Sequence, residues 1–229
     1  MGLELKLAEE VLRELDAEGL RAVFLKYTRK AFEFIPKIKK PHILDIGCGT
    51  GIPTLELARL SNGNITGIDI DQNAINKLNY KIKEAGLSDR IKVFNRSIYE
   101  TKFEDETFDI IWEEGVIHLL DFKKAITECN RILKLNGFLI SGEATNWVDR
   151  KQKNFSKFGF KLLKQIPWAQ ECWWNEYYAP LEKKINSICK KYDNIEDINE
   201  IKNYLREIEL VKKNTLGFEC TTYIMQKIK

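Results

Sequence analysis

Apolar positions recur at helical spacing over the first 40 residues, and from His42 onward short apolar runs alternate with amphipathic stretches. The spacing predicts an N-terminal helix pair over about 3–18 and 18–34. β-Branched and aromatic runs predict four strands, at 42–46, 64–70, 90–95 and 108–114. Helices are expected from Pro53, over 73–85 with Gly86 as the C-cap glycine, and through Ile126 to an end at 136–137.

The last third of the chain departs from this alternation. Strands are predicted at 137–143, within 158–166 and within 218–229, and a charged, aromatic helical segment occupies about 169–213. We expect an α/β fold with a doubly wound, mostly parallel seven-stranded sheet, an antiparallel last strand, and a helical cap inserted between strands six and seven. The whole of 1–229 is expected to be one domain, with N-terminal helices over 1–40 and a core over 41–145.

The composition is that of a globular chain, with 44% of the 229 residues hydrophobic and 31% charged. No apolar run approaches the roughly 18 residues that a membrane-spanning helix needs, and the N-terminus lacks the basic region of a secretory signal. The five cysteines are widely spaced and form no CxxC pair, so neither a disulfide framework nor a metal site is predicted. We expect a cytoplasmic protein without a membrane partner.

The net charge of +3 gives no argument for a nucleic-acid partner. Basic residues nevertheless gather in two stretches. They are interpreted as solvated helix faces; the alternative is a phosphate track for RNA, which would make binding strongly dependent on salt. The stretches are Lys26, Arg29, Lys30, Lys37, Lys39 and Lys40, and Arg150, Lys151, Lys153, Lys157, Lys161 and Lys164.

The segment "DIGCGTG", residues 45–51, lies between the first predicted strand and its helix. Glycine costs roughly 0.5–1 kcal/mol inside a regular element, so such a cluster indicates a tight turn or a close approach of the backbone to a ligand. In a doubly wound sheet this loop lies at the carboxyl edge, where ligands bind. Asp69 ends the second strand about 20 residues later, a spacing that suits binding of ribose hydroxyls. We therefore predict a cofactor that contains adenosine.

The loop distinguishes two classes of cofactor. A dinucleotide site has the pattern GxGxxG and holds a pyrophosphate, whereas this loop reads GxGxG after Asp45, an acid that repels pyrophosphate and suits an ammonium group. Together with "TGIDID", "FDIIWEE" and "RILKLNGFLISGE" in the same order, the loop resembles that of the class I S-adenosylmethionine-dependent methyltransferases. The resemblance covers about 30–145 and extends to the last strand.

This resemblance implies S-adenosylmethionine as the cofactor, S-adenosylhomocysteine as its product, and no metal. Gly47 and Gly49 would let the backbone pass the cofactor, with Cys48 between them as a small loop-filling side chain. Asp45 would lie near the amino-acid end of the cofactor, and the backbone of Glu113 near its methionine portion.

The resemblance also assigns the adenosine end of the site. Asp69 would bind the ribose hydroxyls, and Ile70 would flank the adenine ring. Ser97 stands where many members of the family carry an aspartate that reaches the adenine amino group. The backbone N–H of Ile98 is a second contact for adenine.

Methyl transfer is an in-line displacement, so catalysis can come largely from the orientation of the two reactants. A general base is needed only where the acceptor loses a proton. Glu114 and His118, just after the fourth strand, are the candidates, and a packing role for His118 is an open alternative. No Asn-Pro-Pro-Tyr-like or Asp-Pro-Pro-Tyr-like sequence follows the fourth strand, which disfavours methylation of the adenine amino group or of a glutamine amide.

The segment "ECWWNEYYAPLEKKI" resembles the helical cap of a small-molecule-type subgroup of these methyltransferases. Pro180 is expected to disfavour helical geometry at Ala179, placing a corner beside Tyr178. Trp174 and Tyr178 would then form a wall of the acceptor pocket, with Tyr178 a catalytic candidate; alternatively, the aromatic stripe only packs. We expect a monomeric or homodimeric small-molecule methyltransferase, with an RNA-directed enzyme or a cofactor-binding protein without turnover as alternatives.

Overall fold

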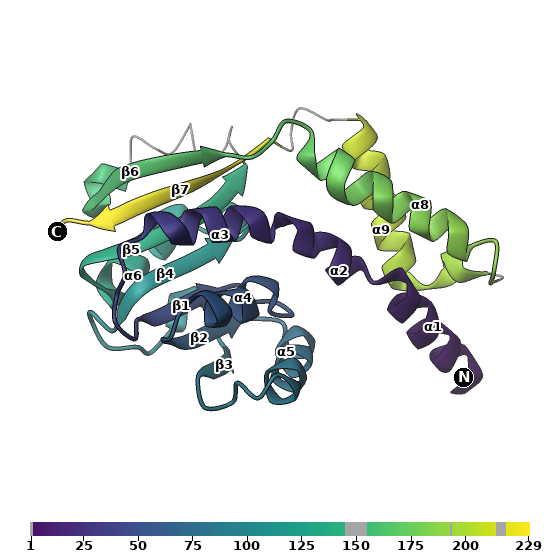
Figure 1. Cartoon of the computed structure of the whole chain (residues 1–229), viewed down its shortest axis with the longest axis horizontal. Helices are drawn as coiled ribbons and strands as arrows, with labels where there is room; N and C mark the ends of the chain where they lie inside the picture. Colours follow the sequence, from purple (N-terminus) through teal and green to yellow (C-terminus); the bar gives the residue numbers. More distant parts are fainter. Residues whose placement is uncertain (1, 145–154, 193, 214–218) are drawn as a thin grey trace. The chain divides into compact units, whose positions relative to one another are not determined.

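The computed structural model describes residues 2–144, 155–192, 194–213 and 219–229 (Figure 1). Contacts divide the chain into two compact units. The sheet unit comprises Leu25–Trp168 and Cys220–Lys229, and the helical unit comprises Met1–Phe24 and Ala169–Glu219. Within the described residues, no helix is both long enough and apolar enough to cross a membrane.

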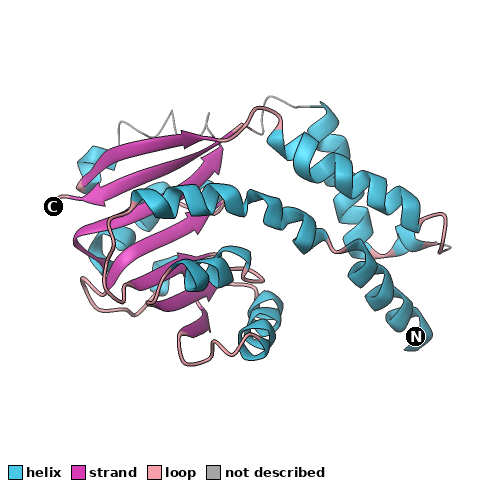
Figure 2. Cartoon of the chain, in the orientation of Figure 1, coloured by secondary structure: helices cyan, strands magenta, loops and turns pink. Residues whose placement is uncertain are grey.

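The sheet unit contains a seven-stranded sheet in the order β3-β2-β1-β4-β5-β7-β6, drawn in magenta in Figure 2. Strands β1 to β5 pair in parallel where they are neighbours, and β7 runs antiparallel to both β5 and β6. The predicted fold class is confirmed. The strands are β1 (His42–Ile46), β2 (Asn64–Asp69), β3 (Ile91–Asn95), β4 (Phe108–Glu114), β5 (Leu133–Ala144), β6 (Phe160–Pro167) and β7 (Cys220–Lys227).

Helices cover both faces of this sheet. Buried side chains of α3 (Leu25–Phe34), α4 (Ile52–Leu60) and α5 (Gln72–Glu84) form one core cluster with the strands, and those of α6 (Phe122–Ile132) form the other. Two aspartates define where helices begin: Asp71 caps α5 and Asp121 caps α6, each accepting a hydrogen bond from a first-turn N–H.

The predicted end of the helix before β5 is wrong. We expected that helix to reach 136–137, but α6 ends at Ile132 and β5 begins at the next residue. Leu133 pairs with Phe108 of β4, and a Cβ on Gly137 would lie 2.9 Å from the Asp109 carbonyl oxygen. Sheet pairing and this close approach to β4 require an extended chain, and they override the local helical pattern.

The helical unit contains α1 (Gly2–Leu15), α2 (Ala17–Arg21), a π-helical turn (Trp174–Tyr178), α8 (Ala179–Ile188) and α9 (Asn199–Lys213). The chain between α1 and α2 turns at Asp16, whose φ of 47° is left-handed and whose carboxylate accepts from the Gly19 N–H. The expected break near residue 18 therefore falls two residues earlier. One face of α8 contributes to the core of this unit: Leu181, Ile185 and Ile188 are buried.

Pro180 lies in the first turn of α8 and makes no corner. Ala179 keeps right-handed helical angles, φ −66° and ψ −44°, so the expectation for Ala179 is wrong. Its N–H donates to the carbonyl oxygen of Trp174, five residues earlier, and the π-helical turn continues directly into α8. Proline costs little in a first turn, and the wider π-helical turn accommodates the residues before it.

We predict that Leu181→Ala lowers the free energy of unfolding by about 2–5 kcal/mol, because it opens a cavity in the core of the helical unit. Urea denaturation followed by far-UV circular dichroism measures the change. Leu210→Ala is the control, since Leu210 on α9 is 55% exposed and its truncation should alter stability by no more than about 0.5 kcal/mol. Equal losses in the two variants would contradict this assignment of the core.

Candidate active site at the carboxyl edge of the sheet

The loop between β1 and α4 is held against the end of β2. The N–H groups of Gly47 and Cys48 donate to the Ile68 carbonyl oxygen at 2.8 and 3.1 Å, and the Gly49 N–H donates to Asp69 Oδ2 at 2.8 Å. Gly47 and Gly49 have positive φ angles of 67° and 49°, which side chains rarely tolerate. The loop residues and the end of β2 therefore form one hydrogen-bonded unit.

The two glycines serve different purposes. A Cβ on Gly47 would lie 2.3 Å from a methyl group of Val116, so this glycine allows the segment after β4 to pack on the loop. A Cβ on Gly49 would meet nothing closer than the Gly47 carbonyl oxygen, 3.9 Å away. One side of Gly49 is thus open, and it presents backbone that a ligand can approach closely.

Asp45 lies buried beneath this loop, 2% exposed. Its Oδ2 accepts a 2.5 Å hydrogen bond from the Thr54 hydroxyl of α4. Burial raises the pKa of Asp45 to about 7, with a smaller contribution from the nearby charges of Glu114 and Asp69. An approaching cation would favour the ionised form of this carboxyl.

Asp69 and Ile70 project at the end of β2. The carboxylate of Asp69 already accepts the Gly49 N–H and, through Oδ1, the Asp71 N–H at 2.8 Å, and these bonds fix its position. Ile70 is 78% exposed, an unusual degree for isoleucine, and offers an apolar surface beside that carboxylate.

Ser97 and Ile98 follow β3, next to the end of β2. The Arg96 N–H donates to the Asp69 carbonyl oxygen at 3.0 Å, which holds the two strand ends together. The Ser97 hydroxyl caps a short helical turn by accepting from the Tyr99 N–H at 3.2 Å, and the Ile98 side chain is buried in the core. The structure therefore brings the four predicted adenosine contacts to one edge.

Cys48 is buried, and burial raises the pKa of its thiol. A Cβ on Gly67 of β2 would lie 2.9 Å from Cys48 Sγ, so the sulfur fills space above that strand. The thiol is un-ionised at neutral pH and does not act as a nucleophile.

Glu113 and Glu114 are adjacent on β4 and point to opposite faces of the sheet. Glu114 lies on the α3 face, where its Oε1 accepts from the Thr28 hydroxyl at 2.8 Å and from Trp112 Nε1 at 2.9 Å. Glu113 lies on the α6 face and is fully buried. Its Oε2 accepts from the Val116 and Ile117 N–H groups at 3.2 and 3.3 Å.

His118 binds a carboxylate that the sequence analysis did not single out. Glu143, near the end of β5 and 1% exposed, accepts from the His118 N–H through Oε1 at 3.2 Å and contacts His118 Nδ1 through Oε2 at 2.7 Å. The sequence indicates Glu143 only as an acidic residue at the end of the predicted strand "GFLISGE". Thr54, the partner of Asp45, carried no such signal, because threonine is common near the start of helices.

Tyr178 belongs to the helical unit, whereas the other predicted site residues belong to the sheet unit. It is 6% exposed and packs with Trp173 and Tyr177, at ring-centroid distances of 5.9 and 4.8 Å. Burial, and the neighbouring charge of Glu207, raise the pKa of its hydroxyl. Its role in a pocket wall, and that of Trp174, stay predictions.

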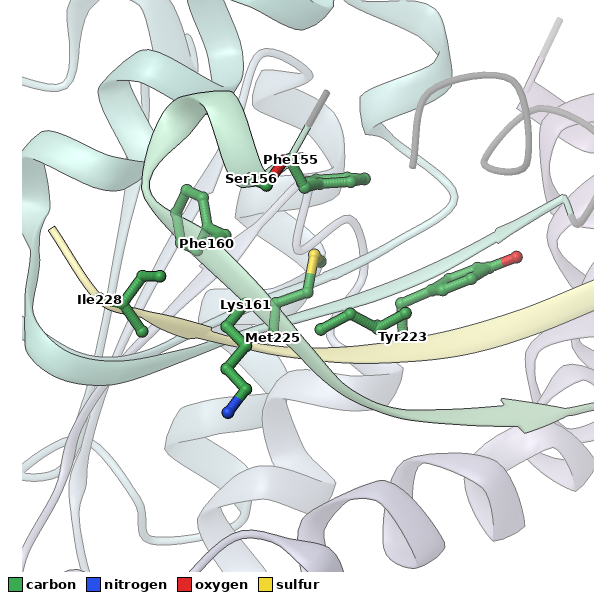
Figure 3. Close-up of a pocket in the computed structure, with 8 residues that line it drawn as sticks. Phe155, Ser156, Phe160, Lys161, Tyr223, Met225 and Ile228 are labelled. Atoms are coloured by element: carbon green, nitrogen blue, oxygen red, sulfur yellow. The ribbon is translucent and has the colours of Figure 1, made fainter. Parts of the chain in front are cut away.

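A cavity of about 370 Å³ lies on β6 and β7, and none of the predicted site residues lines it (Figure 3). Its lining is mainly apolar, with Phe155, Phe160, Tyr223 and Met225 surrounding it. Among the described residues, no cluster of three or more His, Cys, Asp or Glu side chains could hold a metal ion. Arg150, Lys151 and Lys153 of the second basic stretch lie outside the described residues.

Comparisons with known proteins agree with this geometry. Residues 44–141 match the family described as "Methyltransferase domain". An uncharacterized protein of Haemophilus influenzae is 36% identical over 102 residues, 43% of this chain and 41% of that protein. The 27-O-demethylrifamycin SV methyltransferase of Amycolatopsis mediterranei is 28% identical over 129 residues, 56% of this chain and 47% of its own length. The chain thus spans less than half of these curated relatives.

Among solved structures, the [4+2]-cyclase SpnF superposes with a TM-score of 0.75 at 19% identity, covering 88% of this chain and 80% of SpnF. A likeness at this identity establishes the fold, while the reaction depends on the residues of the site. Residues 44–141, which include the glycine loop, are thus similar to a methyltransferase domain.

Proposed function

We propose that this chain transfers a methyl group from S-adenosylmethionine to a small-molecule acceptor. The observation that carries the proposal is the open backbone at Gly49, which is bonded to Asp69 and follows the buried carboxyl of Asp45 at the end of β1. Isothermal titration calorimetry tests it: S-adenosylhomocysteine should bind, and NAD should not. Incubation of a metabolite extract with methyl-labelled S-adenosylmethionine should then give a labelled product identifiable by mass spectrometry.

The residues present fit the chemistry of this cofactor. Its ammonium and sulfonium groups are cationic, and the acidic side chains at this edge complement them while disfavouring a pyrophosphate. Asp69 would bind the ribose hydroxyls, and Ile70 would cover one face of adenine. Ser97 and Ile98 would meet the adenine edge, and Glu113 would lie near the methionine portion. When bound, the cofactor supplies an electrophilic methyl group on sulfur.

Several features support a small acceptor. The Amycolatopsis relative is named as a methyltransferase of a rifamycin, a small molecule. The open side of Gly49 and the segment after β4, where Val116 packs on Gly47, belong to one edge of the sheet unit. We place the acceptor there, with Glu114 and His118 acting on it.

We predict that Asp69→Ala weakens S-adenosylhomocysteine binding by about 1.5–3 kcal/mol, the usual worth of hydrogen bonds to a charged group. Calorimetry measures the change. Asp89→Ala, which removes an exposed carboxylate after α5, is the control and should leave the affinity unaltered. An unchanged affinity in the Asp69 variant would remove this residue from the site.

Binding of S-adenosylhomocysteine should strengthen as the pH rises from 6 to 8. The pKa of Asp45 is raised to about 7, so its carboxyl is neutral below this pH and charged above it, and only the charged form attracts the ligand's ammonium group. Near pH 7, binding should therefore release a proton, seen in calorimetry as an enthalpy that depends on the buffer. Asp45→Asn should abolish the dependence, and its persistence in that variant would contradict the assignment.

Glu114→Gln should lower turnover by about tenfold or more while changing S-adenosylhomocysteine affinity by no more than about twofold, as expected of a group that acts on the acceptor. The amide oxygen can still accept from Thr28 and Trp112, so the fold is retained. Steady-state kinetics on the identified acceptor measure the effect, with the exposed Glu104→Gln as control. Equal turnover in the Glu114→Gln and Glu104→Gln variants would contradict a role on the acceptor and leave Glu114 only its structural bond to Thr28 of α3.

A further inference from the structure

His118 and Glu143 form a geometrically defined pair at the ends of β4 and β5. Glu143 uses both carboxylate oxygens on one residue: Oε1 accepts the His118 backbone N–H and Oε2 lies 2.7 Å from its Nδ1. The carboxylate is buried, whereas the imidazole side chain is 37% exposed. The backbone and the ring of His118 are thus both held, and the ring still reaches the surface.

Two further titratable groups lie beside this pair. Burial and the neighbouring Glu143 raise the pKa of Glu113 well above its usual range, which favours its protonated form. Its Oε2 accepts two N–H groups. Cys129 of α6 is buried close to Glu113, and its thiol is neutral because its pKa is raised.

Contact with the Glu143 carboxylate determines the tautomer of His118. A carboxylate only accepts hydrogen bonds, so Nδ1 must carry a proton, and in the neutral ring Nε2 then bears the lone pair. Val116, two residues before His118, packs on Gly47 of the cofactor loop. This short connection places the imidazole at the same edge as the loop.

We propose that Glu143 is a positioning residue that makes Nε2 of His118 the base for a hydroxyl acceptor. The inference rests on the proposed function, of which it names the acceptor class. The acceptor's hydroxyl proton passes to Nε2 as the oxygen–methyl bond forms and the carbon–sulfur bond breaks, leaving the electron pair on sulfur. The imidazolium is stabilised by Glu143 and afterwards releases its proton to water.

The chain has two histidines, so long-range ¹H–¹⁵N spectra of the neutral rings resolve the tautomer directly, with a His42→Asn variant to assign the signals. We expect Nδ1–H at His118 in the parent protein. In Glu143→Leu the ring should shift toward Nε2–H, the form that free imidazole side chains favour. An Nε2–H tautomer in the parent protein, or no shift in the leucine variant, would overturn the proposal.

Diethyl pyrocarbonate, which acylates an unprotonated ring nitrogen, measures the reactivity of Nε2. At pH 8, Glu143→Gln should slow acylation of His118 by about threefold or more, because nucleophilicity follows basicity and the amide carries no charge. Peptide mass spectrometry follows both histidines, and acylation of His42 should keep its parent rate. This isosteric variant also provides a test if the leucine variant does not fold. Equal His118 rates in the parent and in the glutamine variant would contradict the role of the charge.

Calorimetry with S-adenosylhomocysteine on the same samples separates the two proposals. Binding together with an Nε2–H tautomer would overturn the inference alone, whereas Nδ1–H without binding would overturn the proposed function alone. The extract experiment tests the acceptor class. A labelled product methylated on oxygen supports the inference, and one methylated on carbon or nitrogen overturns it.

Discussion

Parallel pairing of β1 with β2 and with β4 is the constraint on which the candidate site depends. It brings three strand ends to one edge: the Gly49 N–H reaches the Asp69 carboxylate at 2.8 Å, and Val116, just after β4, packs on Gly47. Residues far apart in sequence thereby form one surface. The loop has little freedom of its own, because three of its N–H groups are bonded to the end of β2.

A second feature of this edge of the sheet is its buried carboxyl groups, Asp45, Glu113 and Glu143. Burial of a charge is unfavourable unless the charge is paired or hydrogen-bonded, so each group has a compensating arrangement. Asp45 has the Thr54 hydroxyl and a raised pKa. Burial and a neighbouring carboxyl group raise the pKa of Glu113, and Glu143 contacts His118. A carboxyl group with a raised pKa, such as Asp45, ionises when a cation approaches, and the proposed cofactor carries such a cation.

The alternation of side chains along β4 and β5 separates these groups into two sets. Glu114 faces α3, while Glu113 and Glu143 face the side covered by α6. The hydrogen bonds follow this division: Glu114 accepts from Thr28 of α3, and the opposite face contains Glu143 with its bonds to His118. The two adjacent glutamates of β4 are therefore not a pair in any chemical sense.

The sequence by itself determined the succession of strands and helices along the chain, the glycine loop and the place of Asp69 at a strand end, because these follow from hydrophobic periodicity and from the spacing between a loop and the next strand end. It placed the end of α6 wrongly and expected Pro180 to interrupt a helix, because sheet pairing at Leu133 and the π-helical turn before Ala179 override local preference. The partnership of His118 with Glu143 was beyond its reach. The two residues are 25 positions apart on neighbouring strand ends, and only the register of β4 with β5 decides which side chains meet.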